Sequence, residues 1–286
     1  MFKGLVTASY GKRFEVELQD LSKISCVTRG KKTDLACGDI VNINLTDNNE
    51  GVIESCEPRS SLLFRSNSFR KKLLAANVTQ VVIILATTPS FYETLLNRCL
   101  IASESSHITS LIVLNKCDLV DPAPTISKLS LYSDLGYKVQ KLSAKEDISP
   151  LKELLLNNRS VLVGQSGMGK STIINALFTD LNVRTQEISR ALDSGKHTTT
   201  ATHLYRIDEK SQIIDSPGLQ EFGLNHLNVE TLENAFIEFR PYLGKCRFNN
   251  CRHLHEPDCA IARAVEENSI SMVRLKNYRE ILVEIT

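Results

Sequence analysis

A glycine-rich segment near the middle of the chain has the residue types and spacing of a phosphate-binding loop. The pattern of such a loop is a glycine, any four residues and then Gly-Lys-Ser. It is matched by Gly164, Gln165, Ser166, Gly167, Met168, Gly169, Lys170 and Ser171. Such a loop points backbone N–H groups at phosphate, helped by the positive N-terminus of the next helix. The lysine would pair with the β and γ phosphates, and the serine hydroxyl would ligate Mg²⁺.

The segments on either side of this loop fit the same interpretation. The apolar run Ser160–Val163 predicts a buried strand directly before it. Thr172–Phe178 follows with apolar residues on one face of a predicted helix, and Thr172 is a further candidate nucleotide contact. A chance glycine-rich turn is the alternative, and it does not explain the flanking strand and helix. The segment therefore predicts a nucleoside triphosphate site.

Two further motifs bear on which base is bound. The first motif follows the predicted strand Ser110–Leu114 and consists of Asn115, Lys116, Cys117 and Asp118. The second follows the predicted strand Lys138–Leu142 and consists of Ser143, Ala144 and Lys145. A carboxylate at the first motif can accept two hydrogen bonds from guanine, whereas adenine offers no such donor pair. The second motif suits a backbone contact to the guanine carbonyl. Ligands of open α/β sheets bind at these strand ends, so the motifs favour GTP. A solvated turn is the alternative for the first motif alone.

A fourth motif, Asp-Ser-Pro-Gly, begins at Asp215 and ends at Gly218, after the predicted strand Gln212–Ile214. An aspartate there can hold a Mg²⁺-bound water, and the glycine N–H can sense the γ-phosphate. The polar stretch before it is typical of a nucleotide-ordered switch loop. Within that stretch, Thr199 and Thr200 are equal candidates for the switch ligand to Mg²⁺.

The order of these motifs along the chain is unusual. In ordinary small GTPases the phosphate loop comes first, whereas here Asn115–Asp118 and Ser143–Lys145 precede Gly164–Ser171. This order predicts a circularly permuted G-domain, whose ends are relocated while its site is unchanged. The segment after Gly218 then leads directly into the C-terminal region.

The elements that must position these motifs fall into three regions. Residues 1–66 alternate apolar and polar residues in about five short strands separated by turns, which predicts a small β-barrel of the OB-fold kind. Residues 67–225 alternate strands and helices, which predicts a parallel sheet covered by helices on both faces. Residues 226–286 are mostly helical apart from the Cys/His-rich stretch Cys246–Cys259.

Composition narrows the function classes. The 286 residues carry a net charge of +1 and are 42% hydrophobic, so total charge indicates neither nucleic acid nor membrane. Five of the eight cysteines are scattered singly, which argues against a disulfide framework and fits a reducing compartment. The longest apolar run, Val81–Ala86, is far shorter than the roughly 20 residues that span a bilayer. We expect a cytoplasmic protein without membrane association, and a monomer because no oligomer interface is legible.

Together, the barrel, the permuted motif order and the Cys/His cluster resemble the ribosome small-subunit-dependent GTPases of the RsgA/YjeQ family. The resemblance covers essentially the whole chain. It implies an N-terminal OB-fold barrel, a central circularly permuted P-loop GTPase domain and a C-terminal, mostly helical zinc-binding domain. It also implies a protein that binds the 30S subunit and its 16S rRNA late in assembly, hydrolyses GTP to GDP faster on the ribosome, and then leaves.

The family's zinc pattern is met at Cys246, Cys251, His253 and Cys259. Three thiolates and one imidazole would make a closed tetrahedral site for one structural Zn²⁺, with no open position for catalysis. His255 is a rival ligand. We expect this ion to hold together a small domain with little core of its own.

The resemblance also suggests how hydrolysis proceeds. Ras-like enzymes orient the attacking water with a glutamine after the Asp-x-x-Gly glycine, but here that residue is Leu219. Gln220, one residue further, is expected to point elsewhere. His197 resembles the histidine proposed to take over in the family, and a neutral imidazole could accept a hydrogen bond from the water. A histidine that contacts rRNA is the alternative.

Local charge favours RNA more than total charge does. Residues 1–33 carry seven basic and three acidic residues, a net of +4. An OB barrel is a common platform for RNA, although charge runs are usually solvated faces. Two further function classes stay open: a GTP-gated ribosome-binding module whose hydrolysis is incidental, and an ATP-dependent kinase, which Asp118 disfavours.

Overall fold

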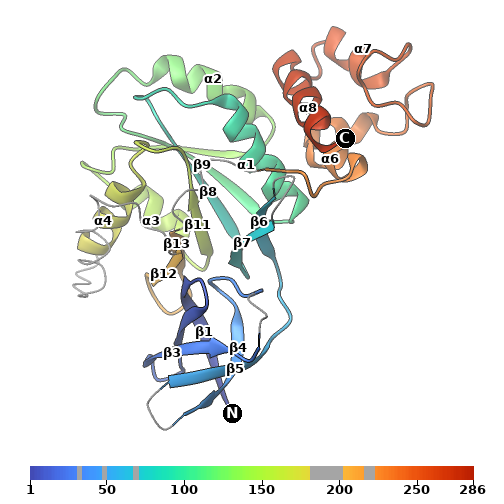
Figure 1. Ribbon diagram of the computed structural model, residues 1–286. Helices are drawn as coiled ribbons and strands as arrows, with labels where there is room; N and C mark the ends of the chain where they lie inside the picture. The colour runs from blue at the N-terminus through green and yellow to red at the C-terminus, as the bar shows by residue number, and fades with distance from the viewer. Residues whose placement is uncertain (31–33, 47–49, 67–70, 181–201, 216–222) are drawn as a thin grey trace.

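The computed structural model describes residues 1–286 with the exception of 31–33, 47–49, 67–70, 181–201 and 216–222, and structural statements below refer to the described residues (Figure 1).

The N-terminal region is a closed five-stranded barrel. Its strands are β1 (Phe2–Tyr10), β2 (Arg13–Glu17), β3 (Lys23–Thr28), β4 (Ile40–Leu45) and β5 (Glu50–Cys56). The barrel closes because β1 pairs with both β2 and β4, while β5 pairs with β3 and β4. Alternate apolar side chains point inward and form a separate core that includes Phe14, Val16 and Ile43. The predicted barrel is confirmed.

A two-stranded ribbon joins the barrel to the next region. It consists of β6 (Leu62–Ser66) and β7 (Lys71–Ala76), paired antiparallel. The sequence did not predict these strands. A bidentate ion pair fixes the chain just before the ribbon: Arg59 contacts the fully buried Asp39 carboxylate at 2.7 and 2.8 Å.

The central region is built on a mostly parallel sheet. Its strands run in the order β10-β9-β8-β11-β13-β12 and are β8 (Gln80–Ala86), β9 (Thr109–Asn115), β10 (Lys138–Lys141), β11 (Arg159–Val163), β12 (Thr202–Arg206) and β13 (Gln212–Asp215). All of them are parallel except β12, which pairs antiparallel with β13. Every residue of β8 is buried, as expected for a strand covered on both faces.

Four helices cover the two faces of this sheet. They are α1 (Glu93–Ser105), α2 (Ala123–Asp134), α3 (Ser149–Leu155) and α4 (Lys170–Asp180). Residues of α1 and α2 pack with one set of alternating strand residues, and residues of α3 and α4 pack with the other set. The first two turns of α2 are mostly exposed and polar and carry no apolar period, so the sequence pattern does not show where this helix begins.

The barrel and the central sheet form one continuous eleven-stranded sheet. Strand β1 pairs antiparallel with β12, with Ala8 opposite His203 and Ser9 opposite Thr202. An ion pair between Arg206 and Glu17 crosses the same junction. The sequence predicted two separate regions and did not predict the pairing of β1 with β12. Strand β12 lies in a polar stretch, and only Leu204 of this strand is buried.

The C-terminal region is helical and packs against α1 (Figure 1). Its elements are α6 (Val229–Ala235), the 3₁₀ helix η2 (Ile237–Tyr242), α7 (Ala260–Glu266) and α8 (Met272–Ile285). Apolar side chains of these helices belong to the same core cluster as α1 and one face of the central sheet. The region thus shares the core of its neighbour, which agrees with the expectation of little core of its own.

A fully buried arginine ties the two regions together. The Arg274 guanidinium pairs with Glu238, hydrogen-bonds the Asn97 side chain on α1, and lies 4.5 Å from the centroid of the Phe236 ring. Asn97 in turn donates to the Tyr132 hydroxyl at 3.0 Å. A buried charge is tolerated only when paired and hydrogen-bonded, as this one is.

Among the described residues, no helix has the length and apolar character needed to cross a membrane.

Candidate functional site

The glycine-rich loop connects β11 directly to α4, as predicted. Two of its glycines have positive φ and leave no room for a side chain. A Cβ on Gly164 (φ +151°) would lie 2.4 Å from the Ile84 carbonyl oxygen, and one on Gly169 (φ +94°) would lie 2.3 Å from the Asn115 amide nitrogen. Both glycines are therefore required for the loop to lie this close to Ile84 of β8 and to the Asn115 side chain.

Lys170, the first residue of α4, folds back into the loop. Its ammonium donates to the backbone carbonyls of Gly164 and Gln165, the second at 2.8 Å. Burial lowers the pKa of Lys170, while the Asp215 carboxylate raises it. Asp215 is the last residue of β13, and burial raises its pKa against the opposing charges of Lys170 and His203. The loop lysine and the aspartate predicted on the Mg²⁺ side thus lie close enough for the charge of each to shift the pKa of the other.

The Asn115 side chain links three of the predicted motifs. Its amide nitrogen donates to the Met168 carbonyl in the glycine-rich loop at 3.0 Å, and its oxygen accepts from the Ala144 backbone N–H at 3.0 Å. Asn115 is buried and ends β9, which β8 separates from β11. A single amide therefore holds the glycine-rich loop and the Ser143–Lys145 segment in fixed positions relative to each other.

The rest of the Asn-Lys-x-Asp motif turns outward from this anchor. Lys116 has φ +61°, and its ammonium donates to the Thr88 carbonyl at 3.0 Å. The Cys117 N–H donates to the Leu142 carbonyl at 3.2 Å. The Asp118 carboxylate is exposed, and the Ser143 hydroxyl lowers its pKa, so it is ionised at neutral pH. An ionised carboxylate at the rim can accept hydrogen bonds from a base.

The remaining residues predicted in the loop differ in exposure. Ser166, Gly167 and Ser171 are exposed, Met168 is buried, and Gln165 and Thr172 are half-buried. Lys145 is also exposed beside the Asp118 motif. The exposed hydroxyls of Ser166 and Ser171 are accessible to a ligand, whereas Met168 contributes to the core beneath the loop.

Sequence reasoning missed the segment that follows β8. The Thr87 hydroxyl donates to the Lys116 carbonyl at 2.7 Å, and the Tyr92 N–H donates to the Gln165 side-chain oxygen at 3.0 Å. This segment therefore braces both the base motif and the glycine-rich loop. Its position after the carboxyl end of a buried parallel strand is the signal that could have identified it.

Four predicted site residues lie outside the described residues. They are His197, Thr199, Thr200 and Gly218. The strands that flank them are described: β12 begins at Thr202, β13 ends at Asp215, and His203 lies opposite Asp215 in the ladder.

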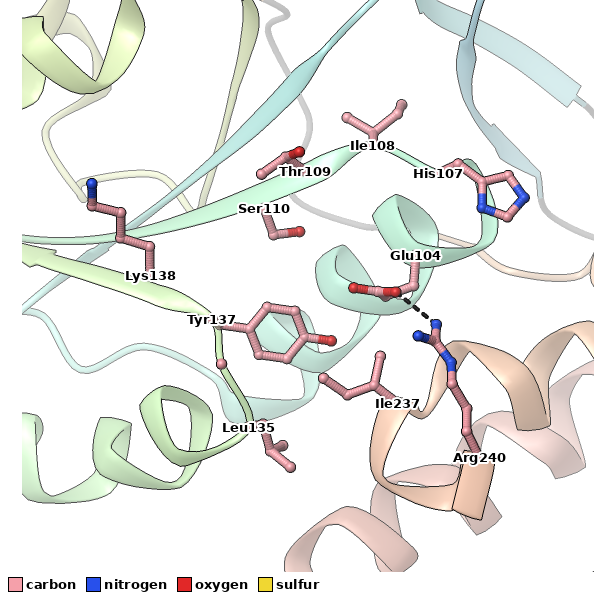
Figure 2. A pocket seen from close by; sticks show the side chains of 11 residues that line it. Glu104, His107, Ile108, Thr109, Ser110, Leu135, Tyr137, Lys138, Ile237 and Arg240 are labelled. Carbon is pink, nitrogen blue, oxygen red and sulfur yellow. Dashed lines mark hydrogen bonds and ion pairs between the residues drawn. The ribbon is translucent and has the colours of Figure 1, made fainter. Parts of the chain in front are cut away.

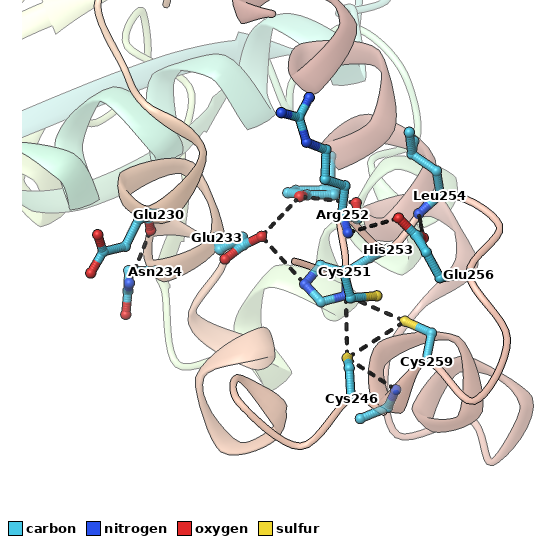
Figure 3. A network of polar contacts seen from close by, with 12 residues as sticks. Glu230, Glu233, Asn234, Cys246, Cys251, Arg252, His253, Leu254, Glu256 and Cys259 are labelled. Atoms are coloured by element: carbon cyan, nitrogen blue, oxygen red, sulfur yellow. Dashed lines mark hydrogen bonds and ion pairs between the residues drawn. The ribbon is translucent and has the colours of Figure 1, made fainter. Parts of the chain in front are cut away.

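The Cys/His residues predicted from the C-terminal pattern form one cluster (Figure 3). Ligand atoms of Cys246, Cys251, His253 and Cys259 all lie within 4.8 Å of one another. The His253 Nδ1 atom is 3.3–3.6 Å from the three sulfur atoms. This donor set and its compactness fit a tetrahedral metal ion. His255 is exposed and does not belong to the cluster.

Neighbouring groups orient these ligands. The Glu233 carboxylate lies 3.4 Å from His253 Nε2, which directs Nδ1 toward the sulfur atoms. Cys259 is the N-cap of α7 and accepts from the Ala262 N–H at 3.5 Å. The Ala260 N–H donates to Cys246 Sγ at 3.3 Å. These N–H groups stabilise thiolates, the form in which cysteine binds a metal.

Comparison with known proteins agrees with this architecture. The family model for the RsgA GTPase matches residues 56–225. The small ribosomal subunit biogenesis GTPase RsgA of Nitrosospira multiformis is 51% identical over 284 residues, covering 99% of this chain and 91% of the relative. The relative of the same name from Nitrosomonas europaea is 48% identical over 283 residues, covering 98% and 90%.

Solved structures show the same fold. The crystal structure of YjeQ from Thermotoga maritima has a TM-score of 0.77 and 28% identity, covering 99% of this chain and 98% of that one. YloQ, described as a circularly permuted GTPase, has a TM-score of 0.71 and 25% identity, covering 100% and 95%. The predicted fold class and motif order are therefore confirmed. The chain belongs to the RsgA GTPase family and is a circularly permuted GTP hydrolase.

Proposed function

We propose that this GTPase acts late in the biogenesis of the small ribosomal subunit, where it binds the 30S particle and couples GTP hydrolysis to its own release. The relatives reported above, about half identical to this chain over nearly its full length, are named small ribosomal subunit biogenesis GTPases. The observation that carries the nucleotide part is the Asn115 side chain, which joins the glycine-rich loop to the Ser143–Lys145 segment. One residue thereby sets the spacing between the phosphate and base subsites.

In this proposal the strand ends form the GTP site. Lys170 moves its ammonium from the loop carbonyls to the β and γ phosphates, which are better partners for a partly buried cation. Asp118 accepts two hydrogen bonds from guanine, and Ala144 and Lys145 approach its carbonyl oxygen. The loop N–H groups from Gly164 to Thr172 surround the phosphates at the N-terminus of α4.

Mg²⁺ would be held by the Ser171 hydroxyl and, through water, by Asp215, with Thr199 or Thr200 added from the switch loop. The ion would neutralise charge on the β and γ phosphates. The ionised state of Asp215 is favoured by Lys170, whose charge opposes the effect of burial. The Gly218 N–H would contact the γ-phosphate.

Hydrolysis needs a group that orients water, and Leu219 cannot serve. His197 is our candidate, brought into place when the ribosome fixes the switch loop. His197→Ala should abolish 30S-stimulated turnover, a loss of roughly 10²-fold or more, while GTP affinity stays nearly unchanged. Undiminished stimulated hydrolysis in this variant would remove His197 from the mechanism.

The C-terminal cluster would hold one structural Zn²⁺. Three thiolates and an imidazole supply all four ligands, so no position remains for a catalytic water. The Cys246–Cys259 stretch has few helical or sheet hydrogen bonds, and the ion would replace them as its organising element.

The 16S rRNA of the 30S subunit is the proposed binding partner of the basic residues. Basic residues gather in the barrel strands and turns and around the metal cluster, the second group being Arg240, Lys245, Arg247 and Arg252. Lysine and arginine in such clusters bind phosphate, which makes the affinity depend on salt. We propose a cytoplasmic monomer, in keeping with this partner.

GTPase assays with and without isolated 30S subunits test the proposal. A large stimulation by 30S subunits supports a ribosome-dependent enzyme. GTP-dependent binding to 30S subunits without stimulated hydrolysis would favour the GTP-gated module instead. That alternative stays open because Leu219 cannot orient the attacking water. Preference for ATP in competition would overturn both.

A further inference from the structure

The two junctions of the central region differ in how close they come to the nucleotide site. The C-terminal region meets it near the starts of β9 and β10, where Arg240 pairs with Glu104 of α1 beside a cavity (Figure 2). Ligands of open α/β sheets bind at the opposite, carboxyl ends of the strands. The barrel joins the sheet through β12, which pairs with β13, and β13 ends at Asp215. The barrel junction therefore reaches the residue proposed to hold a Mg²⁺-bound water.

His203 is the residue at which the barrel junction meets this site. In the ladder it lies directly between Ala8 of β1 and Asp215 of β13. Directly opposite residues of an antiparallel pair share one face of the sheet, with Cβ atoms about 4.5–5.5 Å apart. That face is the one covered by α4, because Tyr205, two residues further along β12, packs with Phe178 of α4. The side chains of His203 and Asp215 are therefore neighbours beneath α4.

The charges of two neighbours act on the Asp215 carboxylate. Burial raises the pKa of Asp215, and the charges of Lys170 and His203 lower it. In the proposed GTP complex the Lys170 ammonium turns to the phosphates, so His203 is the neighbour that remains beside the carboxylate. Carboxylates in metal sites are themselves held by hydrogen bonds from surrounding groups. The N–H group of an imidazole is suited to this task.

Two aromatic contacts hold the His203 ring. Its centroid lies 5.6 Å from that of Tyr10, with the rings edge to face at 72°, and 6.2 Å from that of Tyr205, with the rings stacked at 29°. Both distances are typical of favourable aromatic pairs. Tyr10 ends β1 and is 55% exposed, so its ring lies at the surface where the barrel meets the central sheet. The barrel thus supplies one of the two rings that fix His203.

We propose that His203 is a positioning residue for the Asp215 carboxylate, and that Tyr10 of the barrel holds the His203 ring in place. The inference rests on the proposed role of Asp215 in holding a Mg²⁺-bound water. The barrel then contributes to nucleotide binding, although none of the residues predicted to bind the nucleotide lies in it. A partner that displaces the exposed Tyr10 ring weakens the hold of the protein on Mg²⁺.

The affinity of the full chain for a fluorescent GDP analogue, measured with Mg²⁺ and again with EDTA, tests the role of His203. The ratio of the two affinities reports the contribution of Mg²⁺ without any hydrolysis. His203→Phe keeps an aromatic ring beside Tyr10 and Tyr205 but removes the ring nitrogens. We expect this ratio to fall about tenfold, as when other groups that hold metal ligands are removed. The affinity in EDTA and the melting temperature should stay close to those of the unmodified protein.

Tyr10→Ala tests the contribution of the barrel. It should lower the same ratio about threefold, the effect expected from the loss of one aromatic pair. Phe2→Ala is the matched control: Phe2 is an exposed aromatic residue at the other end of β1, where the strand pairs with β4 instead of β12. This variant should leave the ratio unchanged. Equal ratios for Tyr10→Ala and Phe2→Ala would overturn the part assigned to the barrel.

Asp215→Asn separates failure of this inference from failure of the proposed Mg²⁺ site. It should lower the ratio more than either of the other variants. An unchanged ratio in Asp215→Asn would remove Asp215 from the Mg²⁺ site, and the inference would fall with it. A lowered ratio in Asp215→Asn together with an unchanged ratio in His203→Phe would overturn the inference alone. A fall in the melting temperature of His203→Phe without a change in the ratio would leave His203 a purely structural role and also overturn it.

Discussion

The nucleotide site and the metal cluster are both marked by residue spacing, yet they are held in place in different ways. The residues proposed to bind the nucleotide come from strand ends far apart in the sequence, and a buried sheet with Asn115 as a bridge fixes them. The metal ligands lie within the short segment Cys246–Cys259, whose described residues form no strand and no helix. The His253 Nδ1 atom lies 3.3–3.6 Å from the three sulfur atoms, and Cys246 Sγ lies 3.9 Å from Cys259 Sγ.

This contrast has a thermodynamic meaning. Apolar burial between strands and helices is present with or without a nucleotide, so the nucleotide site is preorganised. Three thiolates within 4.8 Å repel each other unless a cation is bound, so the cluster depends on its metal. Loss of the nucleotide should leave the nucleotide site folded, whereas loss of the metal should disorganise the Cys/His cluster.

The largest predicted effect is that of metal removal. Chelation, or Cys251→Ser, should abolish hydrogen-exchange protection in residues 243–259, since structural zinc contributes on the order of 10 kcal/mol in small domains. Protection in β8 and β11 should remain, because alternate residues of both strands pack in a second core on the other face of the sheet, which contains no residue of the C-terminal region. Metal analysis should find about one Zn per chain. Loss of protection in the sheet as well would break the contrast.

The packing of α8 limits how far that damage spreads. Arg274 and Tyr278 are fully buried, and Arg274 is paired with Glu238 and Asn97. We therefore expect α8 to stay docked on the central region after metal loss. A melting transition of the whole C-terminal region would show that the shared core is weaker than its burial suggests.

The second prediction concerns the preorganised site. Lys170→Ala should weaken GTP binding by roughly 10²-fold or more, because the phosphates lose their buried cation. The melting temperature should not fall, since burial already lowers the pKa of Lys170 and the charge is a cost to the fold. Lys128→Ala, on the exposed surface of α2, is the control and should alter neither. A strong loss of stability in Lys170→Ala would show that the loop depends on its lysine.

The third prediction tests base recognition at the rim. Asp118→Asn should weaken GTP binding about 10–100-fold, because an amide cannot accept both guanine protons. ATP binding should not change, which gives an internal reference. Asp121→Asn makes the same chemical change in the same loop, three residues on, and should leave GTP affinity alone. Equal losses in the two variants would point to loop charge instead of base contact.

The two sites also differ in how much of them the sequence could predict. The phosphate loop and the base motifs were predicted from residue type, spacing and the flanking strands, and the four metal ligands from the Cys/His pattern of the family that the chain resembles. The bridge made by Asn115 could not be found, since it depends on the order β9-β8-β11 in space.

Elements without a strong period were missed as well. Strand β12 buries only Leu204, and the ribbon β6–β7 carries charged residues in its central part. The docking of the C-terminal helices depends on Arg274, a residue type that patterns assign to the surface. Pairing with Glu238 reverses that expectation, and only the three-dimensional arrangement shows the pair.

The smallest predicted effect sharpens the contrast from within the metal site. Glu233 lies 3.4 Å from His253 Nε2 and would orient the ring without being a ligand of the proposed Zn²⁺. Glu233→Ala should lower zinc affinity about 10–100-fold while zinc content at saturation stays at one per chain. Glu230→Ala, on the exposed face of the same helix, is the matched control (Figure 3). If both variants bind zinc as tightly as the unmodified protein, the metal alone orients the four ligands. The cluster would then depend on its metal even more than the comparison with the nucleotide site implies.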